Sequence, residues 1–269
     1  MDRVIQGMDV VIQAAATTSG AKEIVSKPYH HVTDNAVMNS FLFRSCHENR
    51  VKRLIFFSCT VMYSGAGREA VKESDFNYQI TEKYFGAGWT KVYLEKMCEF
   101  YSSLGPTQYT VIRHSNVYGP FDKFDLERSH VFGATVAKVM QAPERGKIVV
   151  WGEGSEARDL LYVDDLVDFV ERSLARQESP FELVNVGLGE SVAVRDLVRK
   201  IIGQSGKDLE IEFDRTKPTI PFSLKLNIER AKRLFGWSPS VSLEEGIRKT
   251  LDWYRSQYLN KEKVRQTVS

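Results

Sequence analysis

The chain has 269 residues, of which 42% are hydrophobic and 27% charged, enough for one large core with or without a smaller lobe. Lysine and arginine number 37 against 35 for aspartate and glutamate, so the net charge of +2 does not indicate a nucleic acid or a membrane surface as partner. The three cysteines lie far apart, and no apolar run approaches the roughly 20 residues of a membrane span, so we expect a cytoplasmic protein without disulfides, metal site or membrane segment.

The first half of the chain alternates between strand and helix patterns. Residues 9–16 (DVVIQAAA), 51–59 (VKRLIFFSC) and 108–113 are short apolar runs, typical of strands buried on both faces of a parallel sheet. Between these runs, apolar residues recur at helical spacing over 35–50 and over 89–104. Because strands and helices in this order require parallel crossovers, the sequence predicts a doubly wound α/β fold.

The pattern changes after Pro120. The expected elements are helices at 131–141, 194–202 and 243–258 and short strands at 148–151, 160–163 and 209–213. We therefore predict a first domain of residues 1–120 and a smaller mixed α/β lobe of residues 121–269, with strands that return to the main sheet. A turn-rich segment at 217–221 and a frayed tail at 260–269 complete the prediction.

Eight segments match, in the same order, those of one enzyme family. They are DVVIQAAA, the helix that we expect Asn35 to open, FFSCTVMY, GWTKVYLEK, HSNVYGP, RSHVFGA, WGEGSEARDLLYVDD and GWSPSVSLEEGI. The chain resembles the extended short-chain dehydrogenase/reductases of the NAD-dependent epimerase/dehydratase type, and is most similar to GDP-L-fucose synthase-like enzymes. The resemblance implies a Rossmann-like first domain that binds NAD or NADP, and a lobe that binds a nucleotide-diphosphate sugar, with a GDP-sugar favoured. It also implies a homodimer formed through the helices of Asn35 and Trp89.

Proton transfer in this family depends on Tyr-x-x-x-Lys, a spacing that puts both side chains on one face of a helix. Lys91 matches the lysine, but four residues earlier the chain has Ala87, whose methyl group transfers no proton. The resemblance therefore implies impaired turnover, by about 10² to 10⁴ where that step is limiting. Tyr84 stands seven residues before Lys91, and we expect this spacing to make it a poor replacement.

Ser58, Cys59 and Thr60 follow a predicted strand, where the family carries a hydroxyl that holds the substrate oxygen. Counting four residues back from Tyr63 gives Cys59, and a shift of one residue would present Thr60, so the triplet is a catalytic candidate as a whole. A small buried cysteine at the end of a strand explains Cys59 equally well. The two residues after Thr60 are apolar, so no carboxylate is available as a base, and a nucleotide-sugar dehydratase is disfavoured.

His130 aligns with a histidine that fucose-synthase-like enzymes use, together with a cysteine, to move protons beside the keto group. In those enzymes the cysteine stands where this chain has Val61, whereas Cys59 lies two residues earlier. A lone histidine at the start of a helix also suits a capping or surface role, so both interpretations of His130 stay open.

Small residues at the end of the first strand leave room for a dinucleotide to approach the backbone. The candidate cofactor contacts are Ala14, Ala15, Ala16, Asn35, Ser58, Lys91, Ser115, Asn116 and Val117. The sequence has no G-x-x-G-x-x-G after an N-terminal strand, and about two of the family's βα units are missing from it. We expect weakened cofactor binding, because those units supply the helix N-terminus that holds the pyrophosphate.

Arg158 matches the family arginine that binds the diphosphate, an anion that a planar guanidinium suits. The other candidate substrate contacts are Asn116, His130, Val131, Lys138, Trp151 and Lys217. The two lysines are also consistent with a solvated surface. We therefore expect an NAD(P)-dependent epimerase or reductase of a nucleotide sugar, and the alternative is a catalytically inactive sugar-nucleotide-binding or regulatory homologue.

Overall fold

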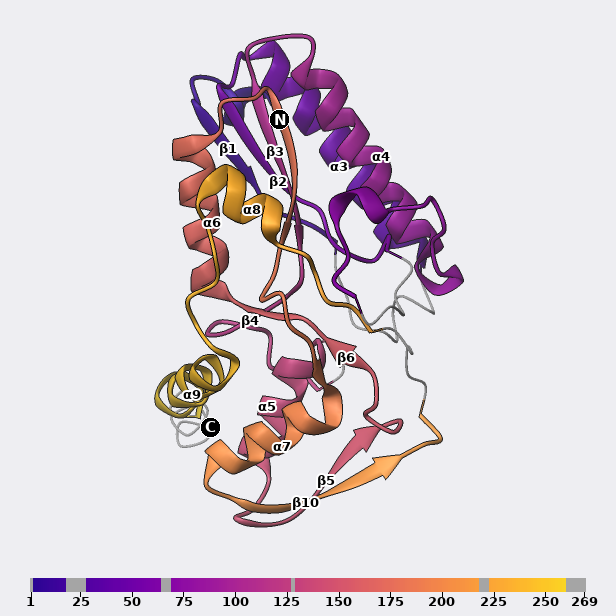
Figure 1. Ribbon diagram of the computed structural model, residues 1–269, viewed down its shortest axis with the longest axis vertical. Coiled ribbons are helices and arrows are strands. Elements are labelled where there is room, and N and C mark those ends of the chain that lie inside the picture. The colour runs from indigo at the N-terminus through magenta and orange to yellow at the C-terminus, as the bar shows by residue number, and fades with distance from the viewer. Residues whose placement is uncertain (1, 18–27, 64–68, 127–128, 218–222, 260–269) are drawn as a thin grey trace.

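A four-stranded sheet with helices on both faces is joined to a smaller lobe (Figure 1). This confirms the doubly wound α/β fold. The computed structural model describes residues 2–17, 28–63, 69–126, 129–217 and 223–259, so the predicted tail and all but Lys217 of the predicted turn lie outside the described residues. Within these ranges no helix is both long and apolar enough to cross a membrane.

The main sheet is parallel throughout, in the order β1-β2-β3-β8. Its strands are β1 (Val10–Gln13), β2 (Arg53–Phe57), β3 (Gln108–His114) and β8 (Phe181–Val186). Strand β8 comes from beyond residue 120 and pairs with β3. In the described sheet β1 is an edge strand, and its Val10 and Ile12 are 41% and 49% exposed, so the prediction that it is buried on both faces is wrong.

Two helix pairs cover the sheet. Figure 1 shows α3 (Pro28–Glu48) and α4 (Phe85–Ser102) on one side and α6 (Val163–Arg176) and α8 (Glu229–Phe235) on the other. The prediction that Asn35 opens its helix is wrong, because α3 begins seven residues earlier, at Pro28. Proline is favoured at the first helical position, where its missing N–H would have no intrahelical partner in any case.

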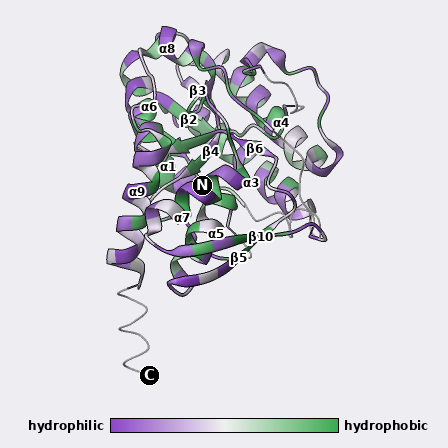
Figure 2. Cartoon of the chain, turned by 60° about the horizontal axis from the view of Figure 1, so that its bottom comes forward, coloured by the Kyte–Doolittle hydropathy of each residue, from purple (hydrophilic) through white to green (hydrophobic). Residues whose placement is uncertain are grey.

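The smaller lobe is built from short strands and amphipathic helices. They are β4 (Asn116–Tyr118), α5 (Val131–Gln141), β5 (Arg145–Trp151), β6 (Ala157–Arg158), β7 (Leu160–Tyr162), β9 (Val192–Ala193), α7 (Val194–Ser205), β10 (Asp208–Asp214) and α9 (Leu243–Trp253). Three further helical turns, α1 (Asp2–Ile5), Glu73–Asp75 and Glu82–Tyr84, and a π-helix, Tyr254–Leu259, complete the described elements. Figure 2 shows hydrophobic strands at the centre of the molecule and polar outer faces on the helices. The domain division at residue 120 stays a prediction. Three elements from beyond this residue, α6, β8 and α8, belong to the main sheet or pack on it.

A buried ion pair joins the carboxyl end of β3 to α4. Arg113 and Glu95, with side chains 3% and 5% exposed, form a two-point contact of 2.6 Å (Nη2 to Oε2) and 3.0 Å (Nε to Oε1). Arg113 also donates to the Tyr63 hydroxyl (2.9 Å), which donates to Asn185 Oδ1 (2.7 Å). Burial alone would lower the Arg113 pKa, but the bonds to Glu95 and its charge raise it above the usual value. The network joins β3, α4, β8 and the segment after β2.

We predict that Glu95→Gln lowers the free energy of unfolding by about 3–5 kcal/mol, because it leaves the Arg113 charge buried without its partner. The matched control is Glu99→Gln on the same helix, since Glu99 pairs with Lys96 at side-chain exposures of 49% and 65%. Exposed pairs contribute about 0–1 kcal/mol. Urea unfolding of the two variants measures the difference, and equal losses would contradict the prediction.

Candidate active site

The carboxyl end of β2 and the first turns of α4 hold a lysine ammonium at the edge of the sheet. Lys91 Nζ donates a 2.8 Å hydrogen bond to the carbonyl of Phe57, the last residue of β2, and lies 4.9 Å from the centre of the Phe56 ring. Burial lowers the Lys91 pKa, against a rise caused by Cys59 and Glu95. The ammonium therefore lies where parallel α/β sheets bind ligands, at the carboxyl ends of their strands.

Of the three candidates that follow β2, Ser58 and Thr60 are buried and Cys59 is half-buried. Ser58 is 1% exposed and its hydroxyl donates to Glu95 (2.5 Å), so the structure turns it into the core and away from the predicted catalytic and cofactor roles. Thr60 is 9% exposed, and its carbonyl accepts a backbone hydrogen bond from Tyr63. Cys59 is half-buried, and burial raises the pKa of its thiol against the effect of nearby Lys91. Of the three, Cys59 is the residue that the structure brings to the ammonium.

Ala87 lies in the first turn of α4 and is half-buried, so the position four residues before Lys91 is helical and carries only a methyl group. Tyr84 is the N-cap residue of the same helix. Burial raises the pKa of its phenol, Arg158 lowers it and Cys59 raises it, so the phenol lies within electrostatic range of both groups. The structure thus brings Tyr84 near both groups at the N-cap of α4, and the expectation about its proton transfer stays a prediction.

His114, which the sequence analysis did not single out, is also part of the site. It is the last residue of β3, its ring lies edge-on to the Phe57 ring at 6.0 Å, and its Nδ1 is 2.7 Å from the Ser115 carbonyl oxygen. Burial lowers its pKa to about 4, the Ser115 carbonyl opposes this, and Lys91 and His130 lower it further. The imidazole is thus neutral at neutral pH, with Nδ1–H donating to that carbonyl. Its place at the carboxyl end of a predicted strand was the available signal.

The predicted cofactor residues after β1 fall into two kinds. Ala14, Ala15 and Ala16 are exposed at the carboxyl end of the strand. Asn35 is buried, and its side chain accepts from the Thr17 N–H (3.0 Å) and donates to the Thr17 carbonyl (3.1 Å). Asn35 therefore holds the backbone that follows β1, rather than facing outward.

Two polar residues that the sequence analysis did not single out, Gln13 and Asn39, support this arrangement. Gln13 Nε2 donates to Asn39 Oδ1 (2.8 Å), and Asn39 Nδ2 donates to the Asn35 carbonyl (2.8 Å). The Ala15 N–H donates to Gln13 Oε1 (3.2 Å). Two asparagines spaced four residues apart, on one face of a helix beside a buried glutamine, were the signal in the sequence.

The residues after β3 connect the sheet to the lobe. Ser115 is buried, and its N–H donates to Val186 (2.9 Å). Asn116 is half-buried and donates through its backbone (3.1 Å) and its side chain (3.2 Å) to the Asp159 carbonyl oxygen. Val117 is half-buried and pairs with Leu161 in β7. The Asn116 and Val117 side chains remain partly accessible, whereas Ser115 is enclosed.

Arg158 lies on β6 beside a buried carboxylate that fixes its backbone. Asp159 is 1% exposed and accepts hydrogen bonds from the N–H groups of Leu188 (2.8 Å), Gly189 (3.2 Å) and Leu226 (3.1 Å). The Arg158 side chain is half-buried, and burial lowers its pKa, against a rise from the nearby Tyr84.

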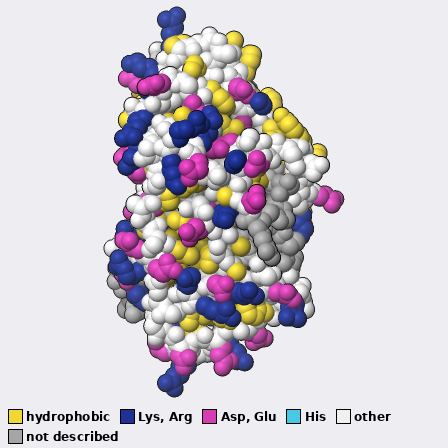
Figure 3. All heavy atoms as spheres, in the orientation of Figure 1, with side chains coloured by type: hydrophobic (Ala, Val, Ile, Leu, Met, Phe, Trp, Pro, Cys, Tyr) yellow, Lys and Arg dark blue, Asp and Glu magenta, His cyan; other side chains and the backbone are white. Residues whose placement is uncertain are grey.

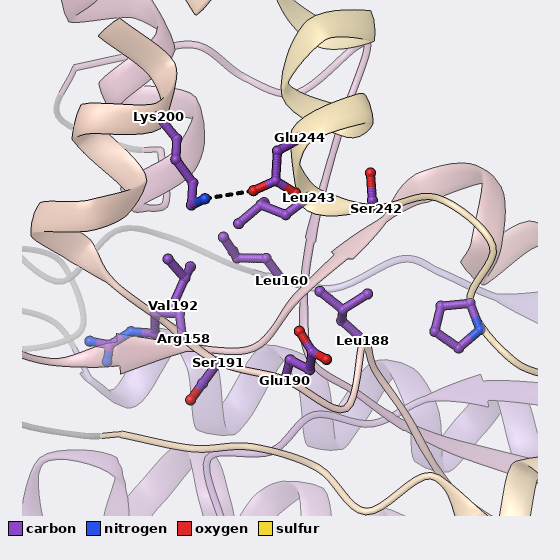
Figure 4. A pocket seen from close by; sticks show the side chains of 11 residues that line it. Arg158, Leu160, Leu188, Glu190, Ser191, Val192, Lys200, Ser242, Leu243 and Glu244 are labelled. Atoms are coloured by element: carbon purple, nitrogen blue, oxygen red, sulfur yellow. Dashed lines mark hydrogen bonds and ion pairs between the residues drawn. The ribbon is translucent and has the colours of Figure 1, made fainter. Parts of the chain in front are cut away.

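Arg158 is among the residues that line a pocket of about 460 Å³. The Lys200–Glu244 ion pair (2.5 Å) closes one side of the pocket, and Figure 4 shows the Arg158 guanidinium extending away from that pair. Tyr84 is among the groups near the guanidinium.

His130 is the N-cap residue of α5, but its side chain makes no capping hydrogen bond, and the residue is exposed. Although the residue is exposed overall, desolvation of its ring by neighbouring groups lowers its pKa, Asp122 raises it, and Lys123 and Arg158 lower it. Val131, the first residue of α5, is half-buried. The structure thus brings His130 near Arg158 and His114, and its proton-transfer role stays a prediction.

The remaining substrate candidates lie on the smaller lobe. Lys138 Nζ donates to the Val149 carbonyl (2.8 Å) and lies 5.9 Å from the centre of the Trp151 ring, which belongs to a residue 42% exposed. Lys217 is exposed and lines a separate pocket of about 400 Å³ with Ser223. Lys138 and Trp151 form one unit, and Lys217 faces a different hollow.

The fold is that of the extended short-chain dehydrogenase/reductases. Residues 1–187 match the model of the NAD dependent epimerase/dehydratase family, and the chain belongs to that family. Where the chain is described, no group of three or more His, Cys, Asp or Glu side chains could hold a metal ion.

Relatives and solved structures agree with this assignment. The chain is 31% identical to a GDP-L-fucose synthase of Azorhizobium caulinodans over 91% of its own length and 80% of that protein. It is 32% identical to GDP-L-fucose synthase 1 of Arabidopsis thaliana, over 93% of this chain and 78% of that one. The crystal structure of a UDP-glucose 4-epimerase with UDP-glucose, from Thermotoga maritima, superimposes with a TM-score of 0.84 at 25% identity, covering 96% and 81% of the two chains.

We predict that acid unfolds the wild-type chain more readily than His114→Gln. The folded-state pKa of His114 is about 4 against an ordinary 6.5, so between these values the unfolded chain binds a proton that the folded chain does not. The contribution of His114 to stability is therefore complete above pH 6.5 and falls as the pH drops toward 4, by at most about 1.4 kcal/mol per pH unit. Urea unfolding at neutral pH and near pH 5 measures it, and identical pH dependence in the two proteins would contradict it.

Proposed function

We propose that this chain is an NAD(P)-dependent epimerase or reductase that acts on a GDP-linked keto or hydroxy sugar. One observation carries the proposal: a half-buried lysine ammonium, bonded to the carbonyl at the end of β2 (2.8 Å), beside the partly accessible Cys59 thiol and the neutral His114. A cation held in a desolvated site stabilises negative charge that develops on an oxygen.

The residues at the carboxyl edge fit a nicotinamide dinucleotide. Ala14, Ala15 and Ala16 are exposed and carry no side chain larger than a methyl group, so a dinucleotide can approach their backbone. Asn35 holds the following turn of backbone in place, and Lys91 offers N–H donors to ribose hydroxyls. The cofactor, when bound, supplies or accepts a hydride. The protein's own contribution is to position the sugar carbon and to move the accompanying proton.

The lobe supports a GDP-sugar as the substrate. Arg158 can bind the diphosphate through two parallel N–H donors, and the partly exposed Trp151 ring, with Lys138 above it, offers a flat surface to a purine base. Asn116, His130 and Val131 precede these groups in the chain and are proposed to contact the sugar. The two relatives that are about 30% identical over most of the chain are GDP-L-fucose synthases, which favours GDP over UDP.

Ala87 supports the second candidate function, a sugar-nucleotide-binding homologue without turnover. A methyl group transfers no proton, so catalysis here depends on another acid or base in the site. Binding of GDP-sugars is common to both functions, and turnover separates them.

For the enzymatic function we predict that Lys91→Met lowers kcat for the reduction of a GDP-linked keto sugar by about 10²–10³, because the charge that stabilises the developing oxyanion is lost. The assay follows oxidation of NADH or NADPH. Lys96→Met is the matched control, since Lys96 lies on the same helix with its side chain 65% exposed. A wild-type chain that binds GDP-linked keto sugars but oxidises no reduced cofactor would favour the binding homologue.

We also propose a homodimer through α3 and α4. These helices expose the apolar residues Val37 (51%), Phe41 (52%) and Phe100 (57%), and Figure 3 shows hydrophobic side chains gathered along the edge where α4 lies in Figure 1. Contiguous exposed apolar surface of this kind is typical of protein interfaces.

From this dimer we predict that the double variant Phe41→Glu, Phe100→Glu has the molar mass of one chain in light scattering, whereas the wild type has that of two. The negative charges of the glutamates would face each other across the interface. Val167→Glu is the control, since Val167 is 51% exposed on α6, on the other side of the sheet. A wild-type protein that already has the mass of one chain would refute the dimer.

A further inference from the structure

We propose that Tyr84 is the group that exchanges a proton with the sugar oxygen in this chain. The inference rests on the proposed function, since hydride transfer at a carbon that bears oxygen requires a proton to move to or from that oxygen.

Tyr84 is the N-cap residue of α4, immediately before a stripe of that helix that faces the segment after β2. The stripe has members at spacings of three and four residues, which lie on one face of a helix: Gly88, Lys91 and Glu95. A Cβ at Gly88 would lie 2.8 Å from the Ile80 side chain and 3.6 Å from Met62 Cα, so this position packs closely against both. Lys91 donates to the carbonyl of Phe57 at the end of β2, and Glu95 accepts from the hydroxyl of Ser58, the next residue. Tyr84 therefore stands four residues before Gly88, at the N-terminal end of this stripe.

The surroundings of the phenol connect the two halves of the site. Tyr84 interacts electrostatically with Cys59, at the end of β2, and with Arg158, on β6 of the smaller lobe. Cys59 in turn lies near Lys91. The phenol is thus within electrostatic range of the group proposed to bind the diphosphate and of the thiol next to the ammonium, which suits a group that contacts the sugar of a nucleotide sugar.

Tyr84 and Lys91 can direct their side chains at one sugar oxygen. Seven residues at a rise of about 1.5 Å separate their Cα atoms by about 10 Å along the helix axis, a span that two long side chains can close from its two ends. Ala87, which stands between them, is half-buried and contributes only a methyl group. A larger side chain at this position would occupy the interval.

The protonation states make Tyr84 available as the proton donor in reduction and disfavour His114. Its phenol is protonated at neutral pH, since burial raises its pKa. His114, with a pKa of about 4, carries no transferable positive charge at neutral pH and is fixed as a donor to the Ser115 carbonyl. Arg158 opposes the rise in the Tyr84 pKa, and it therefore stabilises the phenolate that forms after transfer.

When bound, the reduced cofactor would supply the hydride for a C–H bond at the carbonyl carbon, and the electron pair of the C=O π bond would go to the oxygen. Tyr84 gives its phenolic proton to that oxygen, and the phenolate regains a proton from water. In the oxidative direction the same phenolate accepts the proton of the sugar hydroxyl.

The test compares Tyr84→Phe with the wild type and with Tyr93→Phe. Tyr93 is the control because it lies on α4 and is 53% exposed. Calorimetry without cofactor measures the affinities for GDP and for a GDP-linked keto sugar, and a separate assay measures turnover. We expect Tyr84→Phe to lower kcat by about 10² to 10⁴. It should also weaken binding of the keto sugar while leaving GDP affinity unchanged, and Tyr93→Phe should match the wild type.

Wild-type turnover in Tyr84→Phe would overturn the inference and leave the proposed function intact. A loss of GDP affinity equal to the loss of rate would also overturn it, because Tyr84 would then only shape the nucleotide site. A wild-type chain that neither binds nor reduces GDP-linked keto sugars would overturn the proposed function, and the inference with it.

Discussion

The contact between Arg113 and Glu95 determines how α4 lies against the sheet. Its two parallel N–H to oxygen bonds constrain the rotation of α4 about its own axis as well as its distance from β3. Lys91 is one helical turn before Glu95, so the direction of its ammonium follows from that orientation. The hydroxyl of Ser58, the phenol of Tyr63 and the amide of Asn185 satisfy the remaining polar groups. A buried pair of this kind adds little net stability over apolar packing, and its main effect is positional.

The site keeps its charges apart by leaving most of its titratable groups neutral. Around the Lys91 ammonium, burial keeps the Cys59 thiol protonated and the His114 imidazole uncharged. The ammonium itself is compensated by a backbone carbonyl and by the face of the Phe56 ring. Arg158 then provides the second positive charge from the lobe. Two cations separated by neutral polar groups suit an anionic ligand whose reacting oxygen gains negative charge between them.

Sequence pattern was sufficient for the inner strands and for the class of fold, because continuous apolar runs separated by amphipathic helices admit few other topologies. It was insufficient at α3, whose first turns carry histidines and polar residues that follow no apolar period. It also could not give the direction of the Ser58 side chain, because that direction depends on the hydrogen bond to Glu95 of α4. The neutral state of His114 could not be predicted, since it results from burial by segments distant in sequence. Lys91 was predicted from a short motif, and its ammonium lies at the carboxyl end of β2, whereas the roles of Lys91 and Arg158 stay predictions.

The carboxylate of Asp159 has a consequence for ligand binding. It joins the end of β6 to the turn after β8 and to Leu226, three segments that are remote in sequence. The main chain of Arg158 is therefore immobilised before any ligand arrives, and only the torsions of its side chain are left to be restricted. Binding an anion at this arginine thus costs rotamer entropy of about 2 kcal/mol at most, rather than the ordering of a loop.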